Sequence, residues 1–451
     1  MATGELSVEP IDHTEWWRPA VRQSARDGVM VRPRAATSPV AFWALMVLMG
    51  IVLLSPQEIV PVLKPLRIAL LTAGVAAIAH LFECWFAGRP VTIVTREMKI
   101  VTCLLGWAIV TIPFSLWPGG SVDVLTDLYV KSLLLFWLIA NTVTTERRFQ
   151  QFAWGVTIMT VPIASTAFMN YLSGSYLQGS QRIVGYESAL TTNPNDLALT
   201  LNLILPFALA LLWFTRGWFL RAILLVIVVL DVTAVVLTLS RGGFLTLAVI
   251  LGITVMKLFR SPKRGWGVAL LAVLLLCLPL VPASYWHRLT TITDIESDET
   301  GSAQARRDSS LGALRIILSH PIVGTGLGGD ALALNEEIGT TWTVVHNVYL
   351  QYGVGLGLPG LGLFLALFAT CFASASSARH VVAQGRDARN AAHLAQATWL
   401  SLVAFGVAGF FHPVAYHFYF YYLAGLATAC RTGLTQPISR KATSARFVFN
   451  D

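Results

Sequence analysis

Apolar stretches of about twenty residues follow one another along almost the whole chain. A helix of that length crosses the hydrocarbon core of a bilayer. Only 12% of the 451 residues are charged, about half the roughly 25% found in soluble domains, which excludes an ordinary soluble enzyme and a disordered chain. The pattern predicts an all-α polytopic membrane protein with about twelve transmembrane helices, at 40–55, 67–87, 98–117, 125–143, 150–172, 195–215, 217–239, 243–258, 265–284, 346–373, 394–412 and 414–431.

The same pattern divides the chain into five parts. Residues 1–39 form a basic tail, 40–284 hold the first nine helices, and 285–345 form one long polar loop. Residues 346–431 hold the last three helices, and 432–451 form a second tail. Long loops in compact proteins usually carry function, so the loop is the first place to look for a site.

Lysine and arginine predict the orientation of such a chain, because cytoplasmic loops carry an excess of them. When the N-terminal tail is placed in the cytoplasm, 23 of the 32 Lys and Arg residues fall on that side and nine on the other. We therefore expect both termini in the cytoplasm and the long loop on the outer side.

The long loop contains one helical pattern. Residues 308–310 offer an N-cap, and Pro321 ends the pattern. Between them, apolar residues recur at helical spacing, at Leu311, Leu314, Ile317 and Leu318. We expect an amphipathic helix that lies on the outer membrane surface.

Two outer arginines are candidates for binding an anion. Arg241 lies in Ser240-Arg241-Gly242-Gly243, where the glycines suit a tight turn, and Arg315 lies inside the apolar run of the loop helix. A guanidinium binds phosphate through two parallel hydrogen bonds. The alternatives are an arginine that reaches up to water from a helix end and one that touches lipid headgroups.

Polar residues at two predicted helix starts are further candidates. His346, followed by Asn347 and Tyr349, begins the tenth span at its outer end, where an imidazole is suited to act as a general base. The alternative is an interfacial histidine that caps a helix, and His320, His412 and His417 lie on the same side. Asn195 and Asp196 begin the sixth span, where capping is the stronger interpretation and sugar binding an alternative.

Other chemistry has no motif in the chain. We find no H-E-x-x-H, no C-x-x-C, no serine elbow and no P-loop, so no metal site and no cofactor are predicted. Asp231 in the seventh span is a costly buried carboxylate, expected to bond Thr233 or Thr238. Two arginines and a histidine on one face suit a displacement in which guanidinium neutralises a phosphate-type leaving group and imidazole deprotonates a hydroxyl.

These motifs resemble the O-antigen ligase/polymerase superfamily of bacterial envelope glycosyltransferases. The resemblance rests on the Ser240 to Gly243 motif, on Arg315 followed by Pro321-x-x-Gly324-x-Gly326, and on His346-Asn347-x-Tyr349-Leu350-Gln351. Gly353-x-Gly355, Pro359-Gly360 and Asn193-Pro194-Asn195 also fit, so that the similarity covers about 190–375.

The resemblance implies a GT-C-like fold and a metal-independent, inverting transfer of a glycan from undecaprenyl diphosphate. The enzyme would lie in the bacterial inner membrane with a periplasmic active site. Arg241 and Arg315 would bind the donor diphosphate, His346 would activate the acceptor hydroxyl, and Asn195, Asn347 and Tyr349 would contact substrate. The acceptor would be lipid A–core for a ligase, another lipid-linked glycan for a polymerase of O-antigen or exopolysaccharide, or a Ser or Tyr side chain for a protein glycosylase, of which a polymerase or ligase is expected here. Nucleic acid is not expected.

Two other functions remain open at this point. A lipid-linked glycan transporter or flippase is expected to have charged residues at the membrane midplane and repeated halves, and only Asp231 fits that pattern. A non-catalytic scaffold of an envelope complex would have no use for two arginines and a histidine on one face.

Overall fold

The fold was analysed in a computed structural model, which describes residues 39–177, 182–186, 191–262, 264–277, 279, 301–339, 342–380 and 386–434. Both predicted tails lie outside this range except for Pro39 and 432–434, as does the first part of the long loop.

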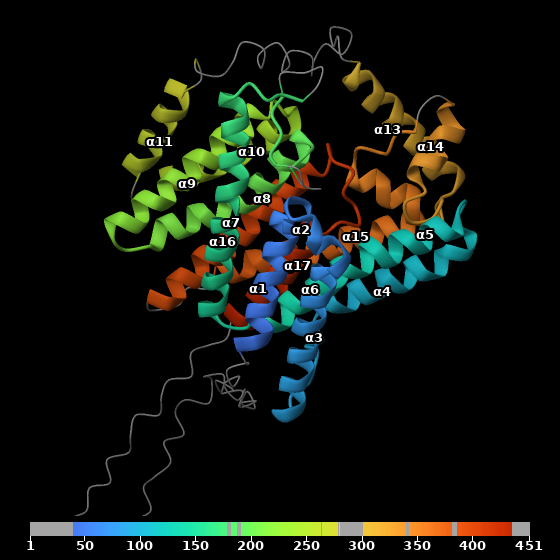
Figure 1. Cartoon of the computed structure of the whole chain (residues 1–451), viewed down its shortest axis with the longest axis horizontal. Coiled ribbons are helices and arrows are strands. Elements are labelled where there is room, and N and C mark those ends of the chain that lie inside the picture. Colours follow the sequence, from blue (N-terminus) through green and yellow to red (C-terminus); the bar gives the residue numbers. More distant parts are fainter. Residues whose placement is uncertain are drawn as a thin grey trace, which may run out of the picture. The chain divides into compact units, whose positions relative to one another are not determined.

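Helices account for the architecture of the described residues (Figure 1). They are α1 (Pro39–Leu54), α2 (Pro56–Ile59), α3 (Ile68–Phe86), α4 (Arg96–Thr111), α5 (Pro118–Val124), α6 (Val130–Thr142), α7 (Glu146–Leu172), α8 (Pro194–Phe214), α9 (Trp218–Leu237), α10 (Arg241–Phe259), α11 (Arg264–Cys277), α13 (Ser302–Ser319), α14 (Asp330–Ile338), α15 (Val348–Arg379), α16 (Arg386–Ala408) and α17 (Phe418–Ala429). Within the same residues, extended backbone pairs only at an isolated bridge between Tyr176 and Ile183.

Eight helices of the described part are long and apolar enough to cross a membrane. They are Ile68–Phe86, Arg96–Phe114, Glu146–Leu172, Pro194–Phe214, Trp218–Leu237, Arg241–Phe259, Val348–Arg379 and Arg389–Ala408. The predicted all-α, multi-pass membrane protein is confirmed. Each of the twelve predicted spans overlaps with helix in the described residues, but α1, α6, α11 and α17 are shorter, so the number twelve stays a prediction.

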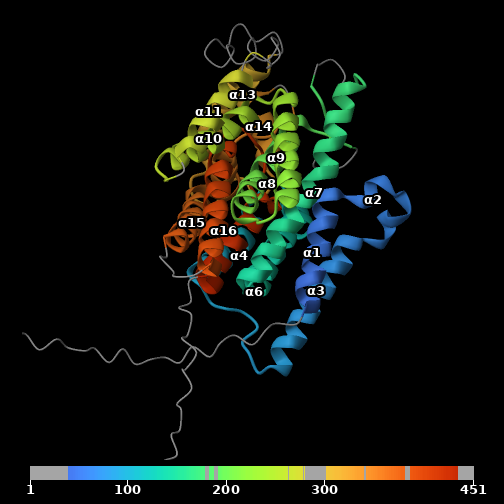
Figure 2. The same cartoon turned by 90° about the vertical axis from the view of Figure 1, so that its left-hand side faces the viewer.

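α8 is the most buried of the eight candidate spans. It packs against α7, α9, α10 and α16, while α15 packs against α4, α16 and α17. Figure 2 shows α8 behind α9 and beside α16. Because α8 is surrounded on all sides, its sequence is apolar around the whole helix and not along one stripe, and Leu199, Leu203 and Phe207 are all almost fully buried.

α15 is broken near its start, and the break ties the long loop to the helix bundle. Gly357 has a φ of 68°, which favours glycine, and Pro359 has no N–H to donate to the Gly355 carbonyl. That carbonyl accepts instead from Gly326 N at 2.9 Å, and Val354 O accepts from Thr325 N at 2.7 Å. The glycine-rich loop therefore replaces the bonds that the broken helix has lost.

α13 differs from the helix predicted in the long loop. It begins at Ser302 and not after 308–310, and it ends before Pro321 as expected. Its buried face consists of Ser309, Gly312, Ala313, Ile316 and Ile317. Three of the four residues of the predicted apolar stripe, namely Leu311, Leu314 and Leu318, are exposed instead.

Close packing against α14 explains this difference. A Cβ added at Gly312 would lie only 3.0 Å from Cδ2 of Leu334, so small side chains are needed on that face of α13. The leucines are left facing outwards, where a membrane surface would suit them.

Asp231 is fully buried in α9, as predicted, but its partner lies in another helix. The Thr160 hydroxyl of α7 donates to Asp231 Oδ2 at 3.0 Å. The two expected partners are not used: Thr238 donates to its own helix, at Val235 O, and no hydrogen bond joins Thr233 to Asp231 among the described residues. A cross-helix bond of this kind fixes the packing of α7 on α9.

Candidate functional site

Six helix ends meet in one region: the N-terminal ends of α8, α10, α15 and α17 and the C-terminal ends of α9 and α16. Hydrogen bonds join these ends directly. Val348 N at the start of α15 donates to Gly409 O after α16, at 2.8 Å. His412 Nε2 lies 3.0 Å from Asn195 O at the start of α8. Four helix N-termini give this region a positive potential that favours an anion.

Asn195 connects the starts of α8 and α10. Its Oδ1 accepts from Ser240 Oγ at 2.8 Å and from Arg182 Nη2 at 2.7 Å. Arg182 Nε also donates to Thr238 O at 3.2 Å. The helix cap that was expected of Asn195 and Asp196 is made by Asn193, whose Oδ1 accepts from Asn195 N. Arg182 is thus a further cation bonded at the start of α8 and the end of α9, and no sequence motif had pointed to it.

Arg241 is the first residue of α10, directly after the N-cap Ser240. The two glycines that follow do not form the turn, which was the expectation; the residue with positive φ is Leu239, at 51°. They permit close packing instead. A Cβ on Gly242 would lie 2.8 Å from Cβ of Phe411, and one on Gly243 would lie 2.6 Å from Cβ of Ala198. Arg241 is therefore held where α10, α8 and the turn after α16 meet.

His346 lies two residues before α15 with its ring in a defined state. Nδ1 is 2.9 Å from the Val344 carbonyl, which can only accept, so Nδ1 carries the proton and neutral Nε2 keeps its lone pair. Burial and the nearby positive charge of Arg306 lower the pKa of His346, opposed by the Val344 bond and the charge of Asp330. The imidazole is accordingly a neutral acceptor at pH 7.

Asp330, the first residue of α14, supports the segment that carries His346. Its buried carboxylate Oδ2 accepts from Val345 N at 2.9 Å and from Gln351 Nε2 at 3.1 Å. Gln351 in turn accepts from Ala415 N at 3.1 Å. One carboxylate thus braces the residue before His346 and the first turn of α15 and, through Gln351, the segment before α17.

Arg306 and Arg315 lie on opposite faces of α13, since nine residues correspond to half a turn beyond two full turns. Arg306 lies on the buried face and acts electrostatically on both His346 and His412. The side chain of Arg315 is 68% exposed, and its Nη1 lies 3.7 Å from Glu337 Oε1 of α14. No described contact joins Arg315 to His346, whereas the positive charge of Arg306 contributes to the lowered pKa of His346.

The other outer histidines are less suited to act as a base. Both ring nitrogens of the buried His412 face backbone carbonyls, Ala408 O at 2.9 Å and Asn195 O at 3.0 Å. His320 is exposed at the end of α13 and bonds Ser319. His417 occupies the N-cap position of α17 without a side-chain capping bond, and its ring packs near Tyr419.

Asn347 and Tyr349 make structural contacts. Asn347 caps α15, with Oδ1 accepting from Tyr349 N and Leu350 N. The Tyr349 hydroxyl donates to Gly406 O of α16 at 2.8 Å. Within the described residues, no group of three His, Cys, Asp or Glu side chains is placed to hold a metal ion.

Residues 225–365 match the protein family described as O-antigen ligase. The match runs from α9 through the Arg241 motif, α13 and His346 into α15, inside the region of 190–375 where the motifs indicated the resemblance. No curated protein matches the chain. The predicted relationship to the O-antigen ligase/polymerase superfamily is confirmed.

Proposed function

The chain is a multi-pass membrane protein of the O-antigen ligase/polymerase type, and from this premise we propose that it transfers a glycan from undecaprenyl diphosphate to an acceptor hydroxyl. The reaction takes place on the periplasmic side of the bacterial inner membrane, in O-antigen or exopolysaccharide synthesis. The observation that carries the proposal is a histidine whose Nδ1 is bonded to the Val344 carbonyl, which leaves Nε2 as an acceptor, where four helix N-termini meet. Burial and the charge of Arg306 lower the pKa of this histidine.

The donor diphosphate binds at these N-termini, with Arg241 and Arg306 neutralising its charge. His346 Nε2 removes the proton of the acceptor hydroxyl, and the resulting oxygen attacks the anomeric carbon from the face opposite the diphosphate. The bond from that carbon to the diphosphate oxygen breaks, and undecaprenyl diphosphate leaves with the electron pair. The configuration is inverted, and no metal ion takes part in this scheme.

In this proposal, Arg306 takes the donor-binding role that the sequence had suggested for Arg315. On the exposed face of α13, Arg315 is paired with Glu337 and is better placed to stabilise the packing of α14 or to meet lipid headgroups. Asn195 and Asn347 use their side-chain carbonyls inside the fold, so only their amide NH2 groups are left for contacts with sugar.

Glycan transfer by the purified full-length protein in nanodiscs tests the proposal. The donor is a glycan on undecaprenyl diphosphate, and two acceptors are compared: lipid A–core for a ligase and a second lipid-linked repeat for a polymerase. Arg306→Ala should lower the transfer rate about 100-fold, as loss of one oxyanion donor does, while Arg306→Lys retains part of it. Arg315→Ala should change it less than about threefold.

His346→Ala completes the set, and a loss of about 100-fold or more is expected. Wild-type transfer by Arg306→Ala or His346→Ala would contradict the site. A larger loss in Arg315→Ala than in Arg306→Ala would return the donor role to Arg315.

A further inference from the structure

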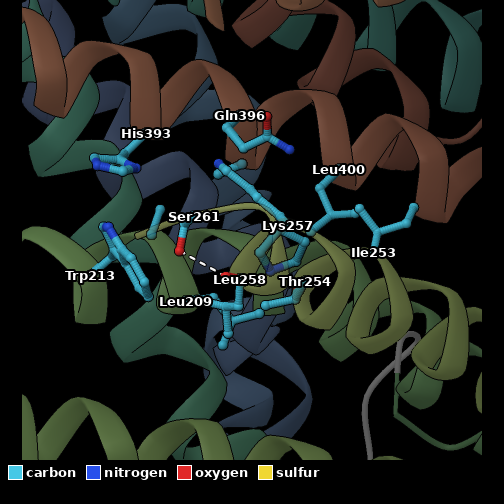
Figure 3. Close-up of a pocket in the computed structure, with 13 residues that line it drawn as sticks. Leu209, Trp213, Ile253, Thr254, Lys257, Leu258, Ser261, His393, Gln396 and Leu400 are labelled. Carbon is cyan, nitrogen blue, oxygen red and sulfur yellow. Dashed lines mark hydrogen bonds between the residues drawn. The ribbon is translucent and has the colours of Figure 1, made fainter. Parts of the chain in front are cut away.

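A cavity of about 230 Å³ lies between α8, α10 and α16, away from the site described above. Its wall is mainly apolar, with Leu209, Ile253 and Leu400 each contributed by a different helix. Figure 3 shows these side chains around the space, with Lys257, His393 and Gln396 also lining it. An apolar cavity with polar groups fits an amphipathic occupant, because both kinds of surface find a partner.

Positive charge is gathered beside this cavity. No carboxylate pairs with Lys257 among the residues that the structure describes. Arg379 is tied to the same cavity wall, because its partner Gln396 lines the cavity together with Lys257. The Arg379 guanidinium lies 3.9 Å above the Trp399 ring, and its Nη1 donates to Gln396 Oε1 at 3.3 Å. An anion at this wall of the cavity would be attracted by both cations.

The cavity lies toward the other end of the same helices. α10 begins with Arg241 in the candidate site, and Lys257 comes sixteen residues later, near its end. At 1.5 Å per residue the two positions are about 24 Å apart along the helix, close to the thickness of the hydrocarbon core. Trp213 is 37% exposed and lines the cavity near His393. Tryptophan is enriched at the membrane–water interface, so this position fits an end of the membrane-spanning region.

We propose that this cavity binds an anionic phospholipid from the leaflet opposite the candidate site. One acyl chain lies against Leu209, Ile253 and Leu400, and the phosphate lies at Lys257 and Arg379. Free phosphate would gain nothing from the apolar wall, and a zwitterionic lipid would gain less from the cations.

Native mass spectrometry of the full-length protein, released from micelles with added lipid, tests this. Phosphatidylglycerol and phosphatidylcholine with identical acyl chains are the two probes. We expect preferential retention of phosphatidylglycerol, weakened about fivefold by Lys257→Gln, which corresponds to about 1 kcal/mol for one cation at a membrane surface. Lys99→Gln, which removes an exposed lysine from α4, is the matched control and should retain the lipid as the wild type does.

A second variant tests the apolar part of the cavity. Thr254→Phe should fill the space beside Ile253 and lower the retention of phosphatidylglycerol although both cations remain. Equal retention of the two lipids by the wild type would overturn the proposal. Unchanged retention of phosphatidylglycerol in both Lys257→Gln and Thr254→Phe, or an equal loss in Lys99→Gln, would also overturn it.

Discussion

One hydrogen bond fixes the tautomer of His346. The lowered pKa of the same ring predicts how the reaction rate depends on pH. Burial and Arg306 hold the pKa of His346 below its usual 6.5, so the base form predominates at pH 7 and is lost as the pH falls through the lowered pKa. We expect kcat/KM for glycan transfer to be level near neutral pH and to fall on an acid limb with its midpoint below 6.5.

His320→Ala, which removes an exposed outer histidine, is the control and should leave this profile unchanged. A midpoint above 6.5 in the wild type would assign the limb to another group. So would an acid limb of the same midpoint in the residual activity of His346→Ala.

At the same scale, the sequence allowed His346 and Arg241 to be selected but not Arg306. Two adjacent arginines, Arg306 and Arg307, follow a polar stretch and resemble a solvated charge pair. Arg315 stood out because its neighbours are apolar. Which face of α13 is buried depends on the small residues that meet α14, and this contact is not visible in the periodicity of the larger side chains.

At the scale of elements, Asp330 links α14 to the segment before α15. Removing its carboxylate should lower the stability of the protein. Asp330→Ala leaves the N–H of Val345 and the Nε2 of Gln351 without their acceptor, which costs about 1–3 kcal/mol. We expect a lower Tm of the protein in detergent, and slower glycan transfer because His346 is less well held. Glu336→Ala, which removes an exposed carboxylate from the same helix, should change neither value. An unchanged Tm in Asp330→Ala would show that this carboxylate braces nothing.

The positions of the helices were largely predictable because each apolar stretch must form a helix in a bilayer, where backbone groups have no other partner. The sequence indicated the position of the break in α15 but not how it is stabilised. Gly353, Gly355 and Pro359 marked a place where helix geometry is weak, but not the partner of the freed carbonyls. That partner, Thr325 and Gly326, lies about thirty residues earlier, and a pairing over this distance has no local signal.

At the scale of the whole molecule, charge bias and site location make one joint prediction about sidedness. The 23 cations assigned to the cytoplasm place α14 and the start of α15 outside, and the proposed reaction needs them there.

We expect a single cysteine at Glu336, in a chain without its five cysteines, to react with a membrane-impermeant maleimide in spheroplasts. A cysteine at Arg389, exposed at the start of α16, should react only after permeabilisation, because α16 must cross the bilayer before it reaches Gly409 beside Val348. The reverse pattern would place the candidate site in the cytoplasm and contradict the proposed periplasmic reaction. Equal reaction of both cysteines in unpermeabilised spheroplasts would mean that α15 and α16 do not separate the two positions across a membrane.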